Sequence, residues 1–460
     1  MPASVAPLVL EPIVRTLCSA HAPTREAATL ALGLLGSPRA VPVLAELLQD
    51  SARAHAELLH SADRQSDLVR PFAAIALGLI GAKDAFAPLR AAIENPDGSL
   101  DLQVCAISAL GLLGEEEPEV SAYLAGLLHR HDLAPVAQAQ VPVAIGRRGT
   151  ASRILVGALL ELATSQKTLP QTRRSCVIAL GQAASLDQVE VMRALQAIAV
   201  GDADQASCNF AWIALAEIAA RDRAFEMNGA AHQAFATLLA AELDQPSTAA
   251  ALPWVALASG ICTRAQPRVG PLLPLGRAYR STSNPSYKAA GRARLGLAGL
   301  KSSADELIRD WRASRDRTFQ GHVAIALGLL RAAGIADDLV ALAVGNGLDW
   351  RCRLSLSHAL AMLGSTQLVP SLLGELESTS SLADAIGIGF ALGAMRDRSA
   401  LPVLSAIMQD HKRISMQRDY AALAIGLCAD RADLPQRARV LAGMNYQALT
   451  PALTELIRVL

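Results

Sequence analysis

The sequence predicts an all-α fold, a solenoid of about twelve helix–turn–helix repeats. Hydrophobic residues make up 52% of the 460 residues and aromatic residues only 3%, because Ala and Leu dominate the apolar part. Such side chains lose little rotamer freedom in a helix, whereas sheets draw on β-branched and aromatic residues. An Ala-Leu-Gly triplet or a close variant also recurs twelve times, at spacings of 32 to 45 residues. A regular period of this length is typical of a repeat array.

The triplet itself predicts how the helices pack. It begins with Ala in eleven of the twelve repeats, the exception being Arg294, and ends with Gly in nine. Gly inside a helix costs about 1 kcal/mol relative to Ala, so its recurrence at one place predicts a close approach of two backbones. We expect all twelve triplet centres to be buried: Leu32, Leu77, Leu110, Ile145, Leu180, Leu215, Leu257, Leu295, Leu327, Leu360, Leu392 and Ile425.

The first repeat shows the elements expected in each of the others. An apolar segment from Thr24 to Gly36 predicts the first helix, Ser37-Pro38-Arg39 the turn, and Val41 to Leu48 the second helix. The widest spacings predict insertions near residues 51–67 and 221–233 that extend one rim. Pro142 is expected to kink the first helix of the fourth repeat.

The stretch Ala28-Thr29-Leu30-Ala31-Leu32-Gly33-Leu34-Leu35-Gly36, repeated closely from Ala73 to Gly81, resembles the HEAT repeat of the phycobilisome-lyase-like subtype. This resemblance implies a right-handed α-solenoid over residues 1–460 as one domain, with first helices on the convex face and second helices on the concave face. Residues 1–20 are then an N-terminal half-repeat or cap, and 445–460 a C-terminal capping helix. The alternative for the N-terminal end is a cut surface of a longer solenoid.

Charge, cysteines and hydropathy narrow the classes of partner. Lys plus Arg is 42 and Asp plus Glu is 42, so no global charge attracts nucleic acid or an anionic membrane. The seven scattered cysteines indicate core residues in a reduced chain. The longest apolar runs are shorter than the 18 or more residues that span a bilayer, and the first residues do not read as a secretory signal. We therefore expect a cytoplasmic protein without membrane contact, a removed signal being the alternative.

Three motifs contain the residue types of catalytic or binding sites, but each is better explained by its structural position in the repeat. Gly387 to Gly393 matches a dinucleotide-type glycine pattern, but it lies in register with the other repeat helices, which favours packing. His129-Arg130-His131-Asp132 and the acidic run from Glu115 to Glu119 read as solvated turns. Nucleophile, zinc-protease and phosphate-loop motifs are missing, as is the His-Glu dipeptide of HEAT-like iron hydroxylases. We expect no enzyme activity, no cofactor and no metal.

One charge feature stands out. No acidic residue occurs from Gln245 to Ala304, while eight basic residues do. The interpretations are Arg stems that cover apolar surface or a patch that binds an anion. The predicted patch consists of Arg268, Arg277, Tyr279, Arg280, Lys288, Arg292 and Arg294. An unpaired buried charge costs several kcal/mol, so Arg294 is expected to emerge beside the other basic residues.

The function that follows is a non-catalytic scaffold that binds a protein partner, one with an acidic segment, along its concave face. The alternative is a nucleic-acid-binding HEAT-like protein that uses the basic patch in repeats seven and eight. Zero net charge favours the scaffold.

Overall fold

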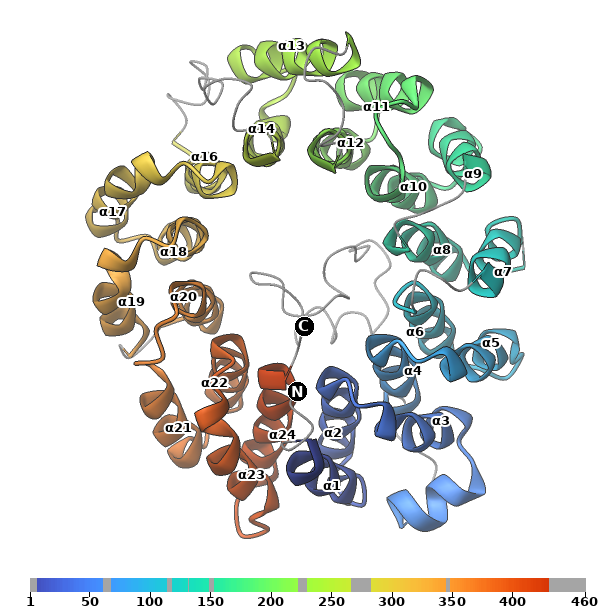
Figure 1. The fold of residues 1–460 in the computed structure, drawn as a ribbon, viewed down its shortest axis with the longest axis vertical. Coiled ribbons are helices and arrows are strands. Elements are labelled where there is room, and N and C mark those ends of the chain that lie inside the picture. The colour runs from blue at the N-terminus through green and yellow to red at the C-terminus, as the bar shows by residue number, and fades with distance from the viewer. Residues whose placement is uncertain are drawn as a thin grey trace. The chain divides into compact units, whose positions relative to one another are not determined.

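A computed structural model describes residues 6–60, 68–113, 118–130, 132–148, 153–221, 230–265, 283–344 and 348–429. This part of the chain is helical and contains no strand (Figure 1). None of its helices is long and apolar enough to cross a membrane. The all-α prediction is confirmed.

Two kinds of helix alternate along the chain, as the repeat predicts. Each triplet lies in a helix that we call a triplet helix: α2 (Ala22–Leu35), α4 (Val69–Ile80), α6 (Leu100–Leu110), α8 (Pro135–Arg147), α10 (Pro170–Ala183), α12 (Gln205–Arg221), α14 (Leu252–Ala265), α16 (Pro285–Ala298), α18 (Arg317–Leu330), α20 (Trp350–Leu363), α22 (Leu382–Met395) and α24 (Ser415–Ala429). The described second helices are α3 (Val41–Gln49), α5 (Phe86–Glu94), α7 (Pro118–Leu128), α9 (Arg153–Thr164), α11 (Val189–Gly201), α13 (Ala230–Asp244), α17 (Ala304–Ala313), α19 (Ala336–Ala343), α21 (Val369–Ser378) and α23 (Leu401–Gln409).

Local sequence explains where these helices begin and end. Pro42 lies in the first turn of α3, where a missing N–H is harmless. The Ser99 side chain accepts a hydrogen bond from the N–H of Leu102 and so caps α6. Gly36 and Gly81 follow α2 and α4 with φ of 64° and 71°, a left-handed conformation that glycine adopts without steric cost.

The structure describes part of the two insertions and of the segments at the two chain ends. The helix expected at the N-terminal end is present as α1 (Ala6–Thr16), which packs against both α2 and α23. In the first insertion, Ala54–Leu59 forms a π-helix. Residues 222–229 of the second insertion and the capping helix expected at 445–460 lie outside the described residues.

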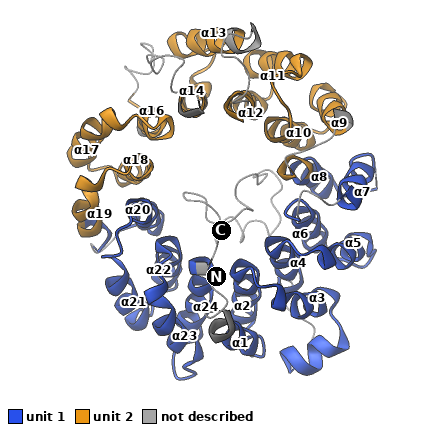
Figure 2. Cartoon of the chain, viewed as in Figure 1, with its two compact units in different colours: residues 1–144, 342–460 blue, residues 145–341 orange. Residues whose placement is uncertain are grey.

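The chain divides into two compact units (Figure 2). Unit 1 comprises residues 1–144 and 342–460, and unit 2 comprises residues 145–341. Within unit 1, α2 of the first repeat packs against α24 of the last described repeat as extensively as it packs against its sequence neighbour α4. Unit 1 therefore contains a contact between its two chain segments, which we call the seam.

Close approach at the triplet glycines is confirmed. A Cβ added to Gly33 would lie 2.4 Å from the Cα of Ala76 in the next triplet. Gly78 and Ala109 show the same arrangement at 2.7 Å. Across the seam, a Cβ on Gly426 would lie 2.7 Å from the Cα of Ala31. The last described repeat thus meets the first through the contact that joins consecutive repeats.

These small residues also explain the curvature, which differs from expectation. In each unit, the triplet helices lie on the inner side of the bend and the second helices on the outer side (Figure 1). The expectation that first helices form the convex face is wrong. Neighbouring triplet helices share extensive contacts, whereas neighbouring second helices share few. Because Gly and Ala let helix axes approach on one side only, each unit curves toward the triplet helices.

Ten of the twelve predicted triplet centres are buried, and Leu257 and Leu295 are half-buried. Leu257 reflects a register error in the prediction. A Cβ on Gly260 would lie 2.7 Å from the backbone oxygen of Arg294, so Ala258-Ser259-Gly260 occupies the triplet position in α14. Its centre, Ser259, is 1% exposed.

Candidate functional site

The triplet defines a side of each triplet helix that faces away from the second helices. Residues advance by about 100° around an α-helix, so the first and third triplet positions point toward neighbouring repeats. The centre points toward the second helices. The residue before the triplet and the residue after it are each about 200° from the centre, on the opposite, inner side. We call this the inner position of a repeat.

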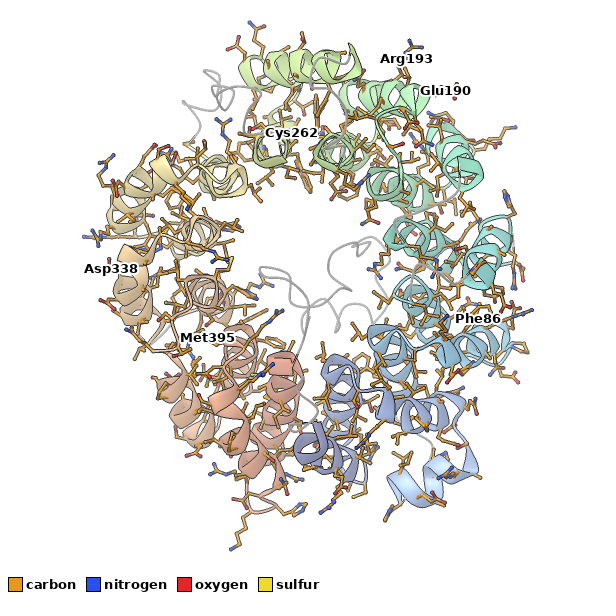
Figure 3. All side chains as sticks on the ribbon, viewed as in Figure 1. Phe86, Glu190, Arg193, Cys262, Asp338 and Met395 are labelled. Carbon is orange, nitrogen blue, oxygen red and sulfur yellow. The ribbon has the colours of Figure 1, made fainter. Side chains whose placement is uncertain are left out.

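Unit 2 presents a row of half-buried apolar side chains at its inner positions. This row, which we call the free face, consists of Ile178, Ile213, Leu257, Ile261, Leu297, Ile325 and Leu329. It extends over α10, α12, α14, α16 and α18, which lie in sequence along the inner side of unit 2 (Figure 3, where Cys262 marks α14). A continuous row of accessible apolar residues is typical of an interaction surface.

Most inner positions of unit 1 differ in accessibility. Leu30 is 1% exposed, Ile75 0%, Phe390 1% and Leu423 3%. The free face is therefore a property of unit 2 and does not follow from the repeat pattern alone.

Two aromatic residues border the free face. Phe210 and Trp254, each one turn before an inner position, form an edge-to-face pair between α12 and α14. Their ring centroids are 5.8 Å apart and the ring planes are inclined by 82°. Both side chains are half-buried. Aromatic residues that are held rigidly yet remain accessible are the preferred anchors of protein interfaces.

Polar residues take the inner positions after the triplets of α10 and α12. They are Gln182 and Glu217. Burial raises the pKa of Glu217 to about 7, although the positive charge of Arg221 lowers it. Arg221 in turn donates to the backbone oxygen of Ala184 at 2.8 Å. The carboxyl group of Glu217 therefore binds a proton more readily than an exposed carboxyl group, beside the apolar row.

The segment from Gln245 to Ala304, which contains eight basic and no acidic residues, does not form the predicted patch in its described part. Arg294 is 4% exposed, and its Nη1 donates to the Oγ of Ser259 at 3.4 Å. The expectation that this side chain emerges is wrong, because the shifted register of α14 places a buried hydroxyl opposite it. Arg292 forms ion pairs with Glu306 at 2.8 Å and Asp310 at 2.6 Å. These acids, which lie just after Ala304 in the sequence, neutralise the charge of Arg292.

The remaining members of the predicted patch have separate positions. Lys288 is exposed, and its neighbour Tyr287, which is not part of the patch, packs against Leu252 and Ala256. Arg268, Arg277, Tyr279 and Arg280 lie outside the described residues. Of the seven predicted residues, the described part contains only Lys288 as an exposed base that carries no ion pair there.

The other sequence motifs are described in part, and residues 115–117 of the acidic run lie outside the described residues. Gly387 and Gly389 lie in α22, where an added Cβ would lie 2.7 Å from the Cβ of Trp350 and 2.9 Å from that of Tyr420, which confirms the packing interpretation. Arg130 pairs with Glu94 at 2.9 Å and with Asp132, while His131 is outside the described residues. The described residues contain no group of three metal-ligating side chains.

The cysteines are free, and five of the seven are buried as predicted. The buried residues are Cys105, Cys176, Cys208, Cys352 and Cys428. Cys262 is half-buried, and burial raises the pKa of its thiol to about 12. Cys18 is exposed, contrary to the prediction of a core residue.

Two family descriptions match the chain. "HEAT repeats" matches residues 55–143, and "PBS lyase HEAT-like repeat" matches residues 24–50. The helix pairs of these segments recur through the described residues. The chain is a HEAT-repeat protein. No curated protein matches its sequence.

Solved structures similar to this HEAT-repeat protein include Kap95p with RanGDP, at 12% identity and a TM-score of 0.42, covering 92% of this chain and 60% of that chain. Importin beta matches at 13% identity and a TM-score of 0.41, covering 92% and 66%. Kap121p bound to Pho4p matches at 14% identity and a TM-score of 0.40, covering 98% and 54%. The chain thus spans about half to two thirds of the length of these structures.

Proposed function

We propose that this protein is a non-catalytic scaffold and that the free face of unit 2 binds an apolar segment of a protein partner. The observation that carries the proposal is the row of seven half-buried apolar residues on neighbouring triplet helices. Burying such residues against a partner contributes about 25 cal/mol for each Å² of apolar surface removed from water. The Phe210–Trp254 pair supplies aromatic anchors beside this row.

Helix spacing limits the kind of segment that fits. Packed helices lie about 8–10 Å apart, so neighbouring repeats offer apolar contacts at that interval. A helix repeats its apolar side chains at this distance every six or seven residues, at about 1.5 Å per residue. The partner segment is therefore expected to be an amphipathic helix that lies across several repeats.

Charge substitutions on the free face test the proposal. The variant combines Leu257→Glu and Ile325→Glu, and the control is Val200→Glu, because Val200 is 45% exposed on second helix α11, away from the free face. Proteins captured by cross-linking are compared among wild type, variant and control, with nuclease added. A partner retained by the control and lost by the variant supports the proposal. A capture profile unchanged by the double variant, with an unchanged melting temperature, contradicts it.

An acidic segment in the partner is a further part of this proposal. It rests on Arg268, Arg277, Arg280 and Lys288 with Tyr279, since Arg294 is buried and Arg292 is paired. Changing Arg277 and Arg280 together to Glu is expected to weaken capture of the partner without changing the melting temperature. Loss of binding only after nuclease treatment would instead favour the nucleic-acid alternative.

A further inference from the structure

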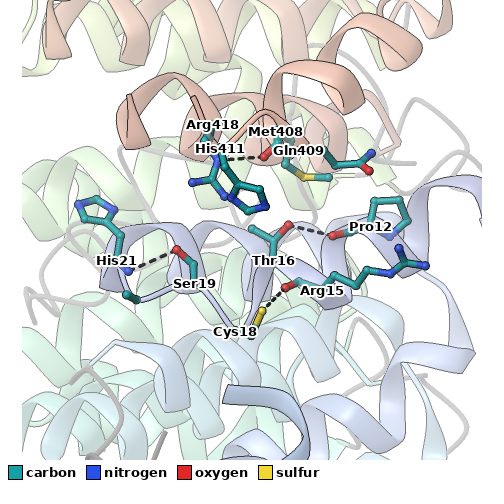
Figure 4. A pocket seen from close by; sticks show the side chains of 11 residues that line it. Pro12, Arg15, Thr16, Cys18, Ser19, His21, Met408, Gln409, His411 and Arg418 are labelled. Carbon is teal, nitrogen blue, oxygen red and sulfur yellow. Dashed lines mark hydrogen bonds between the residues drawn. The ribbon is translucent and has the colours of Figure 1, made fainter. Parts of the chain in front are cut away.

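The seam of unit 1 contains a cavity that the scaffold function does not use. Its volume is about 520 Å³, within the range of small-molecule sites. One wall is formed by the end of α1 and the residues before α2, and the other by the end of α23, the loop after it and α24 (Figure 4). The lining residues are Pro12, Arg15, Thr16, Cys18, Ser19, Ala20, His21, Met408, Gln409, His411 and Arg418.

The charge of this lining is one-sided. Arg15, His21, His411 and Arg418 contribute basic groups, and no lining residue is acidic. Acidic side chains lie close by: Glu11 and Asp419 pair with lining residues, and the charge of Arg418 also acts on Asp419. Glu11 pairs with Arg15 at 3.2 Å, Asp410 with Arg413 at 3.4 Å, and Asp419 with His21 at 3.2 Å. Asp419 also accepts a hydrogen bond from Thr24.

Two of the basic groups have donors available. The Nε of Arg418 donates to the backbone oxygen of Met408 at 3.0 Å, which orients the guanidinium group. Its terminal nitrogens have no hydrogen-bond partner among the described residues, and the same holds for the exposed ring of His411. A guanidinium fork held in this way suits an anion that accepts two hydrogen bonds.

A hydroxyl group and apolar surface complete the lining. The Oγ of Ser19 accepts a hydrogen bond from the N–H of His21 at 3.3 Å, which leaves the Ser19 hydroxyl hydrogen free to donate. Pro12 and Ala20 provide apolar surface. The cavity thus combines anion-binding donors with a surface for an uncharged organic group.

We propose that this cavity binds a small organic phosphate. The phosphoryl oxygens accept hydrogen bonds from Arg418, His411 and Ser19, while the organic group packs against Pro12 and Ala20. Because the lining comes from both chain segments of unit 1, the bound molecule connects the two sides of the seam. Binding therefore stabilises the seam by mass action.

Isothermal titration calorimetry with the full chain tests the assignment. The probes are phenyl phosphate, inorganic phosphate, benzoate and phenol. Phenyl phosphate is expected to bind in a saturable manner and about tenfold or more tightly than each of the others, since it alone combines a dianion with a ring. Absence of saturable binding of phenyl phosphate, or equal affinity for benzoate, overturns the proposal.

Substitutions locate the binding. Arg418→Gln and His411→Gln are each expected to weaken phenyl phosphate binding by about tenfold, because each removes a hydrogen bond to a charged group. Arg418 also bonds Met408, so His411→Gln, on an exposed loop, separates binding from folding. The matched control is Lys412→Gln, an exposed base beside His411 that does not line the cavity. Unchanged affinity of His411→Gln, or an equal loss in the control, overturns the site.

Hydrogen exchange adds a readout of the seam itself. Saturating phenyl phosphate is expected to slow amide exchange in residues 16–30 and 408–420 and to leave unit 2 unchanged. The Leu257→Glu/Ile325→Glu variant should bind phenyl phosphate as the wild type does, so this proposal and the scaffold proposal fail separately. Exchange that slows equally throughout the chain contradicts binding at the seam.

Discussion

Substituting Gly426 tests whether the seam is a true repeat contact. The expected effect of Gly426→Ala has two opposing parts. Replacing Gly by Ala in a helix stabilises it by about 1 kcal/mol. The added Cβ, however, would lie 2.7 Å from the Cα of Ala31, closer than real Cβ contacts, and 3.0 Å from its Cβ. Relieving such overpacking costs about 1–3 kcal/mol, so α2 and α24 are expected to separate.

The matched control is Gly374→Ala in α21, where no atom lies within 4 Å of the added Cβ. This control receives the gain in helix stability without the clash. The difference in unfolding free energy between the two variants therefore measures the contact across the seam, about 1–3 kcal/mol.

Denaturant unfolding combined with hydrogen exchange is the assay. Gly426→Ala should accelerate exchange in α1, α2 and α24, while Gly374→Ala should leave these helices protected. If Gly426→Ala unfolds at the same denaturant concentration as Gly374→Ala and protects α2 equally, then α2 and α24 do not form a repeat contact in solution.

Three further predictions concern the core, a titrating residue and the thiols. Leu110→Ala and Leu327→Ala, both at fully buried triplet centres, are expected to destabilise the protein by about 2–5 kcal/mol in denaturant unfolding. The raised pKa of Glu217 stabilises the fold fully below its usual value of 4.5, and this contribution is lost as pH rises through about 7. Glu217→Gln should abolish that pH dependence, measured as melting temperature from pH 4.5 to 8. Unfolding midpoints should not change with chelator or reductant, since every cysteine is free; a shift with either agent would contradict this.

The repeat architecture could be predicted because each triplet residue has one physical task. Gly33 permits close approach, Ala76 of the next triplet receives it and Leu32 fills the core. These tasks depend on neighbours one repeat away, so a regular spacing in the sequence reveals them. The seam depends on Ala31 and Gly426, which are 395 residues apart, and no periodic pattern indicates that two distant repeats meet.

Two wrong expectations, the burial of Leu257 and the exposure of Arg294, have one cause in α14. Both Ala256-Leu257-Ala258 and Ala258-Ser259-Gly260 place small residues two apart, and a Leu centre fits the other repeats better. Packing decides for the second set, because Gly260 alone lets the backbone of Arg294 approach. That choice brings Leu257 to an inner position and buries Ser259 beside the guanidinium group of Arg294. One shift of two residues therefore adds an apolar side chain to the free face and removes a charge from the basic patch. This is why we propose an apolar partner segment for the free face.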